Sequence, residues 1–462
     1  MSSVSPFSPK LSYEGERGFH GASDYAKALL RSLGIPETRL IETSPIHPAL
    51  ANANSGLMSI TGPADGPPQV CPAQLATCAE GVLLAIQTLA PDIDLNQLSG
   101  PHLLTERAAL MGLSRNGRIA PGASCHLLDA KDGRIAINLA REDDWAMLPA
   151  WLESDAISGD VDQWQDLASL VSKGSVGELV SRGRLMGLAV APECLPTPKD
   201  QWFDVLVTGD KRYKSQTPLV LDLSSLWAGP LCTHLLHTLG ARVIKVESTH
   251  RPDGARNGNA DFYDLLNAGK QSLGLDLKSA HGQTQLKKLI SQADIVIESS
   301  RPRALRQMGI VAEDMVAARP GLSWISITAY GRRGAQADWV GFGDDVGVAA
   351  GLSGLMSAVS GESMFVGDAI ADPLTGMHAA LLAWSSYLAG GGQLISVPMH
   401  DVTAHCVGWG LPTSAVALQE HYRQWADMVS LDEVAAPKPR YASASAQSLG
   451  ADNAALIAEF SL

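Results

Sequence analysis

The sequence lacks the features that mark metal-binding, secreted and membrane proteins. Its six cysteines are scattered without a CxxC pair, and its histidines form no regularly spaced set of metal ligands. A chain of 462 residues can bury a sizeable core without disulfide bonds, so reduced thiols are expected. The first residues, MSSVSPFSPK, lack the charged and apolar regions of a signal peptide, and the most apolar helical stretch, 377–389, is too short to span a bilayer. We therefore expect a cytoplasmic protein without a metal.

The sequence also lacks an excess of positive charge. Its formal net charge of −13 argues against nucleic acid or an anionic membrane as a partner. The charge is uneven, however, because residues 217–340 carry 14 Lys or Arg against 11 Asp or Glu. A basic region in an acidic protein is suited to a small anionic ligand.

Residues 218–330 alternate short apolar runs with helix-like segments. The runs are LVLDL (219–223), ARVIKVE (241–247), SLGLDL (272–277), DIVIES (294–299) and LSWISITAY (322–330). Short apolar strands separated by helices predict a parallel sheet with right-handed crossovers and helices on both faces. The expected fold class is therefore α/β, with a Rossmann-like, doubly wound, mostly parallel sheet domain.

Polar and arginine-rich segments follow several of these predicted strands. They are SSLWAGP (224–230), STHRPDGAR (248–256), SSRPRALR (299–306) and GRRG (331–334). In a doubly wound sheet such segments meet at the carboxyl edge, where ligands bind. A helix beginning near Pro230 would add the positive end of its dipole to an anion site there. The first segment has one glycine where the fingerprint GxGxxG needs three, so NAD and FAD are disfavoured.

The chain before this sheet has a different pattern. DAKDGRIAINL predicts a β-hairpin with its turn at Asp132 and Gly133, and helical segments follow it, which predicts a smaller α+β domain. Turn-rich and charged residues then predict a linker. The expected parts are an N-terminal extension (1–45), a segment that contains the first SGLMS (46–100), the small domain (101–200), the linker (201–217), the sheet domain (218–411) and a C-terminal return segment (412–462).

Several blocks of sequence, in order over residues 218–397, resemble the class III CoA-transferases (the CaiB/BaiF family). They are LDLSSLWAGP, LGARVIKVE, NAGKQSLGLDLKS, ADIVIESSRP, LSWISITAYG, SGLMS and AIADPLTGMHAALLAW. The resemblance implies a Rossmann-like domain that binds coenzyme A, and an aspartate that carries first the acyl group and then CoA as covalent intermediates. It also implies an acyl-CoA donor, a small carboxylic acid acceptor and a homodimer.

The resemblance places the nucleophile at Asp372, in AIADPLTGMH. A carboxylate oxygen can attack a thioester carbonyl to give a mixed anhydride, which the released CoA thiolate can attack in turn. The alternative is that Asp372 only caps the apolar helix that follows it. Asp344, in GFGDDVG, matches a second active-site carboxylate of some members and is expected to act as acid or base. Racemases of the superfamily have a histidine near this place, so its absence argues against a racemase.

The resemblance also implies which residues bind CoA. Positions that line the CoA site match Leu226, Ser299, Ser300 and Arg301, and Trp227 falls near the place where members contact the substrate acid. Basic residues for the phosphates are expected at Arg251, Arg256 and Arg306, although the family usually has an arginine where this chain has Gln307. The mobile glycine-rich loop of the family corresponds to GRIAPG (117–122), which has fewer glycines.

The pentapeptide SGLMS occurs twice, at 55–59 and at 353–357. Aligned without gaps, residues 51–85 and 349–383 share further identities, which indicates an internal repeat. In this alignment Gln74 takes the place of Asp372, and a neutral amide cannot form the anhydride. The first copy is therefore expected to be structural. One chain would then combine parts that two interlocked subunits normally share, and residues 101–200 should lie near Asp372.

Three functions are compatible with these observations. The leading one is a CoA-transferase that moves CoA from an acyl-CoA to a carboxylic acid. The alternatives are an acyl-CoA isomerase or lyase, which needs no free acid, and a catalytically silent CoA-binding or scaffold protein. The shuffled order of the parts, Gln307 and the altered loop favour the silent alternative, whereas the intact block around Asp372 favours an enzyme.

Overall fold

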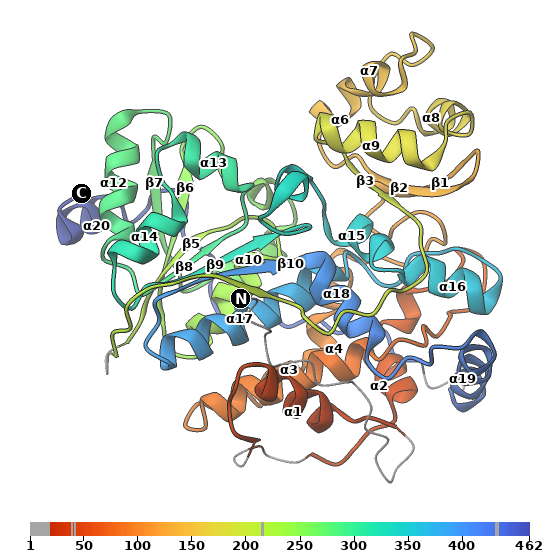
Figure 1. The fold of residues 1–462 in the computed structure, drawn as a ribbon, viewed down its shortest axis with the longest axis horizontal. Helices are drawn as coiled ribbons and strands as arrows, with labels where there is room; N and C mark the ends of the chain where they lie inside the picture. Colours follow the sequence, from red (N-terminus) through yellow and green to blue (C-terminus); the bar gives the residue numbers. More distant parts are fainter. Residues whose placement is uncertain (1–18, 38–39, 41–42, 214–216, 430–433) are drawn as a thin grey trace, which may run out of the picture.

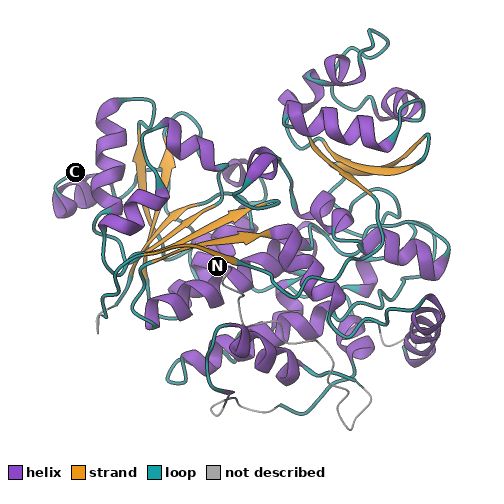
Figure 2. Ribbon diagram, in the orientation of Figure 1, coloured by secondary structure: helices purple, strands orange, loops and turns teal. Residues whose placement is uncertain are grey.

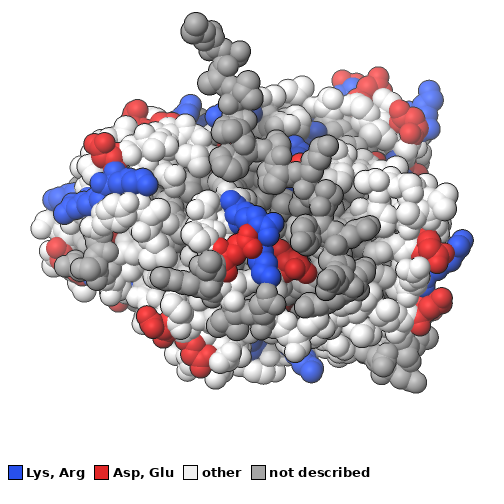
Figure 3. Space-filling model, turned by 60° about the horizontal axis from the view of Figure 1, so that its bottom comes forward, with Lys and Arg blue, Asp and Glu red and all other residues white. Residues whose placement is uncertain are grey.

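The computed structural model describes residues 19–37, 40, 43–213, 217–429 and 434–462. Figure 1 shows a large sheet flanked by helices, a smaller sheet with its own helices, and a group of N-terminal helices beside α17. Residues 1–18, 38–39 and 41–42 of the predicted N-terminal extension lie outside the described residues. On the face in Figure 3, Lys and Arg side chains stand singly or in small groups, several of them next to Asp or Glu, and much of the face is uncharged.

The large sheet has seven strands in the order β4-β10-β9-β8-β5-β6-β7. In that order they are β4 (Asp204–Thr208), β10 (Gln393–Pro398), β9 (Ser323–Thr328), β8 (Ile295–Glu298), β5 (Leu219–Leu223), β6 (Arg242–Ser248) and β7 (Gln271–Leu275). All neighbours are parallel except β4 and β10. The strand order reverses between β5 and β8, which makes this the switch point of a doubly wound sheet. The predicted α/β class is confirmed.

Helices cover both faces of this sheet (Figure 1). The first face carries α10 (Ala228–Thr238), α11 (Ala260–Asn267) and α17 (Ala371–Leu388), and the second carries α12 (Ala280–Ile290), α13 (Pro302–Gln307), α14 (Ala312–Ala318) and α20 (Asn453–Phe460). Successive strand residues point to opposite faces, so Val220 packs in the first core and Leu221 in the second. Because both faces are covered, these strands are almost continuously apolar.

The small domain is a three-stranded antiparallel sheet with helices on one side (Figure 2). Its elements are β1 (Cys125–Ala130), β2 (Gly133–Asn138), α6 (Glu142–Ala146), α7 (Leu148–Leu152), α8 (Trp164–Val171), α9 (Val176–Met186) and β3 (Ala189–Pro192). The predicted hairpin is confirmed, since Ala130 pairs with Gly133. The sheet begins at Cys125, whereas α4 (Gly100–Leu103) packs on α3 and α5 (Glu106–Met111) on α11. The other side of the sheet packs on α15 (Gly343–Ala349).

Part of the predicted linker is a strand. β4 lies within 201–217 and pairs antiparallel with β10 at the edge of the large sheet. Its burial is only partial, with Val205 41% exposed. Turn-rich and charged residues on both sides obscured this short strand in the sequence. Residues 214–216 of the linker lie outside the described part of the chain.

Two N-terminal helices repeat the packing of two helices of the sheet domain. α1 (Ala22–Ser32) packs on α3 (Leu75–Leu89) as α10 packs on α17. The four buried residues of α1 are Tyr25, Ala26, Leu29 and Leu30, and the residues at the same positions of α10, Leu231, Cys232, Leu235 and Leu236, are also buried. A Cβ on Gly81 would lie 2.7 Å from the carbonyl oxygen of Ala22, and a Cβ on Gly376 would lie 2.6 Å from that of Ala228. The close approach of each helix pair therefore depends on a glycine at the same place.

This packing shifts the alignment of the two copies by three residues. With Gly81 matched to Gly376, Thr77 takes the place of Asp372. The predicted match of Gln74 with Asp372 is therefore wrong, because the segment between SGLMS and the contact glycine is three residues longer in the first copy. Thr77 is buried and carries no carboxylate, so the first copy lacks the nucleophile in either alignment.

Candidate active site

The turn after β5 lies at the switch point of the sheet. The Ser225 amide donates a hydrogen bond to Ser299 Oγ (3.2 Å), which ties this turn to the end of β8. Leu226 has φ +69°, a left-handed conformation that is unfavourable for a side chain other than glycine. Its side chain is 42% exposed. The turn thus presents an exposed apolar side chain where ligands of doubly wound sheets bind.

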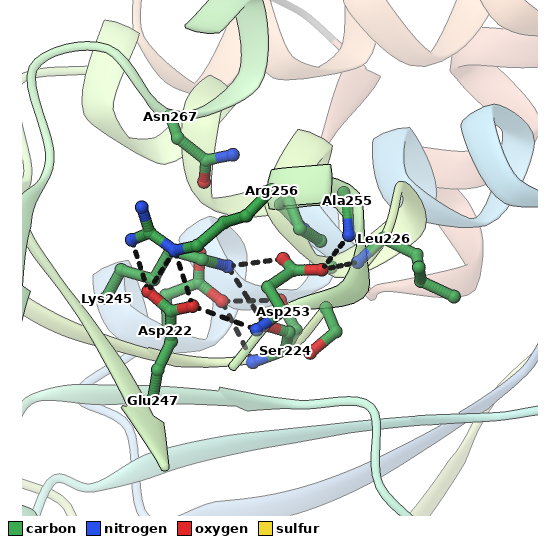
Figure 4. Close-up of polar contacts among 12 residues, drawn as sticks. Asp222, Ser224, Leu226, Lys245, Glu247, Asp253, Ala255, Arg256 and Asn267 are labelled. Carbon is green, nitrogen blue, oxygen red and sulfur yellow. Dashed lines mark hydrogen bonds and ion pairs between the residues drawn. The ribbon is translucent and has the colours of Figure 1, made fainter. Parts of the chain in front are cut away.

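A buried ionic network holds this turn in place (Figure 4). Asp253 accepts hydrogen bonds from the amides of Leu226 and Ala255, both at 3.0 Å, and pairs with Lys245 at 2.9 Å. Lys245 also donates to the carbonyl oxygen of Ser224 (3.1 Å). Burial lowers the pKa of Lys245, but the surrounding carboxylates raise it above its ordinary value, so the lysine is charged. Such a network can hold a strained backbone.

Two of the predicted phosphate-binding arginines are already paired with carboxylates. Arg256 forms an ion pair with Glu247 at 2.6 Å and donates to the carbonyl oxygen of Gln447 (3.1 Å), so it anchors the return segment to the sheet. Arg306 pairs with Glu313 at 2.9 Å on the surface. Both arginines therefore form ion pairs within the fold itself.

Arg251 and Arg301 form no ion pair with a described residue, in contrast to Arg256. Burial lowers the pKa of Arg301, and repulsion by Arg303, Arg141 and Arg251 lowers it further. Arg141 comes from the small domain. Arg141 and Arg303 are paired with Asp144 and Asp338, so Arg251 and Arg301 are the cations of this edge without an ion-pair partner among the described residues. Two such arginines at the edge of the sheet are suited to an anion.

Trp227 connects this edge to the predicted nucleophile. Its ring is 3% exposed, stands edge-on to Phe262 at 5.3 Å, and has the Arg107 guanidinium 5.7 Å from its centroid. The next residue, Ala228, begins α10, and its amide hydrogen-bonds to the Asp372 carboxylate. The turn after β5 and Asp372 are thus direct neighbours.

Asp372 is the second residue of α17 and is partly exposed. Burial raises its pKa to about 6, while Arg107 and the amides of Ala228 and Gly343 lower it. The group is therefore mainly ionised at neutral pH but poorly solvated. A carboxylate in that state can act as a nucleophile.

Three further carboxylates, all buried, surround Asp372. Asp344 accepts a hydrogen bond from the Ala369 amide (2.8 Å), and burial followed by repulsion from Asp368 raises its pKa to about 7. Burial raises the pKa of Asp345 to about 8. The sequence identified Asp344 but missed Asp345 and Asp368, for which the only available signal was their proximity to Asp344 and Asp372 along the chain.

The sequence also missed Arg107, which α5 brings to these carboxylates. Its Nη1 atom donates to both carboxylate oxygens of Asp368, at 2.8 and 2.9 Å. Gly122, the last residue of the predicted loop GRIAPG, lies beside it, since a Cβ there would be 3.3 Å from Arg107 Nη2. Residues from 101–200 therefore do lie near Asp372.

Comparison with known proteins supports the assignment of this region. Residues 218–446 match the model of CoA-transferase family III. This part of the chain belongs to CoA-transferase family III. The family III match contains Asp372 and the carboxyl edge of the sheet, whereas Arg107 and Gly122 lie outside it.

Relatives of the family III region include three curated CoA-transferases. Succinyl-CoA–D-citramalate CoA-transferase of Chloroflexus aurantiacus is 31% identical over 193 residues, covering 39% of this chain and 48% of its own. Succinate–glutarate CoA-transferase of Agrobacterium fabrum is 32% identical over 203 residues (40% and 50%), and formyl-CoA:oxalate CoA-transferase of Escherichia coli is 30% identical over 200 residues (40% and 48%). The chain thus spans about half the length of the curated relatives it matches. The crystal structure of a CaiB/BaiF family protein from Brucella suis is 28% identical, with a TM-score of 0.37, and covers 42% of this chain and 55% of that one.

Two further features concern the described residues alone. No group of three or more His, Cys, Asp or Glu side chains is arranged there to hold a metal ion. None of the described helices is both long and apolar enough to cross a membrane.

Proposed function

We propose that this protein transfers CoA from an acyl-CoA to a carboxylic acid, with Asp372 as the nucleophile. The observation that carries the proposal is the partly exposed, ionised Asp372 beside the turn after β5. Membership of the central region in CoA-transferase family III supports it. A group that served only as a helix cap would not need to be surrounded by three more carboxylates.

The proposed reaction begins with attack by the Asp372 oxygen on the thioester carbonyl of the donor. The C–S bond breaks, CoA leaves as a thiolate, and the acyl group stays on Asp372 as a mixed anhydride. The thiolate then attacks the Asp372 carbonyl carbon and releases the donor acid, which leaves CoA on the enzyme as a thioester. The acceptor carboxylate repeats the two steps in reverse order, so the thioester energy is conserved.

The residues around Asp372 suit a reaction in which the charge of that carboxylate is lost and then regained. Asp344 has a pKa of about 7, so it can hold or release a proton as the charge on Asp372 disappears and returns. We place the nucleotide end of CoA toward Arg251 and Arg301, with Leu226, Ser299 and Ser300 along the edge of the sheet. Trp227 would face the acyl group.

We also propose that the N-terminal copy and the small domain complete the active site of their own chain. Arg107 and the loop ending at Gly122 already lie beside Asp368 of the same chain, next to the nucleophile. A homodimer is compatible with this arrangement, but neither Arg107 nor the loop would need to come from a second subunit. The cytoplasm would supply the substrates.

Asp372→Asn tests the nucleophile directly. The asparagine variant should lose CoA exchange while its melting temperature still rises with CoA or acyl-CoA, because a ligand that binds only the folded state stabilises it. Mass spectrometry of the wild type mixed with acyl-CoA should show an adduct on Asp372. Turnover without any added acid would instead indicate an isomerase or lyase, and a ligand shift without turnover a silent binding protein. Unchanged exchange in the asparagine variant would overturn the proposal.

A further inference from the structure

We infer that Arg107 is a positioning residue: it holds the backbone segment before Asp372 and so keeps the nucleophile in the position needed for attack. The inference rests on the proposed function. It concerns a side chain outside the family III match, carried by α5 of the N-terminal half. Arg107 makes no hydrogen bond to Asp372 among the described residues, so it acts through Asp368.

The backbone before Asp372 is strained and is held from three sides. Gly367 and Ala369 have φ of +72° and +43°, and a left-handed alanine is unfavourable. The Gly367 amide donates to Thr61 Oγ1 (3.1 Å), in the first copy of the repeat. Between them Asp368 is fully buried and receives both of its side-chain bonds from Arg107 Nη1.

This strained segment fixes the start of α17. The Asp372 amide donates to the carbonyl oxygen of Ala369 (2.9 Å), so a change at Ala369 would move the nucleophile directly. The Ala369 amide is bound to Asp344 Oδ1 in turn. The N-terminal half therefore supplies two of the three supports of this segment, Arg107 and Thr61.

Arg107 also opposes the negative charge around the nucleophile. Two charged groups act on Asp372 in opposite directions: Asp368 from the strained segment raises its pKa, and Arg107 from α5 lowers it. Asp344 and Asp345 from α15 titrate at higher pH than Asp372, so they are mainly protonated when Asp372 loses its proton. The Asp368 carboxylate thus disfavours the ionised form of Asp372, and Arg107 favours it. Without this cation the buried Asp368 would either be an unpaired charge or take up a proton.

The guanidinium occupies a confined place beside the substrate region. It lies over the Trp227 ring, and Gly122 leaves the space that a Cβ would fill 3.3 Å from Nη2. Its side chain is 23% exposed. A lysine could keep the charge, but it lacks the planar guanidinium that lies over the Trp227 ring.

The test compares Arg107→Met and Arg107→Lys with Arg115→Met. Arg115 lies on the same N-terminal half but binds only carbonyl oxygens, those of Gly66 and Ser59, so it controls for loss of a structural arginine. In Arg107→Met the midpoint of the acid limb of kcat should rise by about one pH unit. At pH values below the midpoints of both proteins, the variant should therefore have about tenfold less activity than the wild type. Arg107→Lys should show a smaller shift than Arg107→Met, and Arg115→Met should show none. The KM for the acyl-CoA should change little in all three variants.

The ionisation of Asp372 can be followed without turnover. With 13C-labelled aspartate, the Asp372 carboxyl signal, assigned by its loss in Asp372→Asn, should titrate at higher pH in Arg107→Met than in the wild type. Adduct formation by the wild type combined with an unchanged pH profile and carboxyl titration in Arg107→Met would overturn the inference and leave the proposed function standing. A wild type that forms no adduct with any acyl-CoA would overturn both.

Discussion

At Asp372, burial and hydrogen bonding act in opposite directions on one carboxyl group. Burial raises the pKa above its ordinary value of 3.8, to about 6, and Arg107 with two backbone amides limits the rise. The result is a carboxylate that is ionised at neutral pH and still weakly solvated. The sequence shows that residue 372 is an aspartate, whereas its pKa depends on Arg107, Ala228 and Gly343, which lie in three separate segments.

The pH dependence of the activity follows from this balance. The attacking form is the carboxylate, so kcat should be full above about pH 7 and fall as the pH decreases through about 6. Steady-state rates between pH 4.5 and 8 with a saturating acyl-CoA check this, with protein stability monitored at each pH. An acid limb with its midpoint near 4, the ordinary value for an aspartate, would contradict the environment described for Asp372.

Asp345 allows a test of stability that does not depend on activity. Its folded pKa of about 8 lies above the ordinary 3.8, so its contribution to stability is complete below pH 4 and is lost as the pH rises through 8. Between pH 7 and 9 the wild type should therefore lose about 1.4 kcal/mol more free energy of unfolding than Asp345→Asn. Urea unfolding at both pH values measures the difference. Equal losses in the two proteins would show that Asp345 does not titrate in this range.

At the scale of elements, the site depends on how closely α15 approaches the start of α17. A Cβ on Gly343, the first residue of α15, would overlap the Asp372 carboxylate and the carbonyl oxygen of Ala369. The Gly343 amide also binds the Asp372 carboxylate. The glycine is thus required by contact between two helices rather than by its own φ angle.

Gly343→Ala should displace one of the two helix ends. We expect at least a tenfold loss of kcat and a loss of about 1–3 kcal/mol of stability, as for overpacked sites. The matched control is Gly177→Ala in α9, where a Cβ has open space, and this change should leave activity unaltered and stability equal or higher. Activity assays and thermal unfolding of both variants compare them. Equal behaviour of the two alanine variants would contradict the contact.

Elements with a strong local pattern were predicted correctly, and those set by their neighbours were not. The apolar runs of β5 and β8 and the Asp132–Gly133 turn carry their signals within a few residues. β4 is a short, half-exposed edge strand between turns, so its sequence resembles a linker. The correspondence between Thr77 and Asp372 could be recognised only from the close contact of Gly81 with α1 in the folded chain.

At the scale of the whole molecule, the two halves of the chain meet at one site. Arg107 and Thr61 come from the N-terminal half, while Asp368 and Asp372 come from the sheet domain. If each active site is completed within its own chain, two variants that are impaired by substitutions in different halves cannot restore each other's activity when they are mixed.

Mixing Asp372→Asn with Arg107→Met tests this at pH 6, where both variants should be impaired. Co-expressed in one cell, they should show no more activity than Arg107→Met alone at the same concentration. Recovery toward about a quarter or more of the wild-type activity would show that Arg107 acts on Asp372 of another chain, as in an exchange of parts between subunits. Wild type co-expressed with Asp372→Asn provides the reference for a mixed population.

Local sequence patterns were enough to predict the doubly wound sheet, the hairpin of the small domain, the resemblance to class III CoA-transferases and Asp372 as the candidate nucleophile. These depend on local periodicity, turn residues and contiguous motifs, which a chain carries in its order of residues. Contacts between distant segments were needed to show that Arg256 and Arg306 are paired, that Thr77 matches Asp372, and that Arg107 binds Asp368 beside the nucleophile. Residue 107 and residue 368 meet only because α5 packs beside the sheet domain, and no local pattern records a contact across 261 positions of the chain.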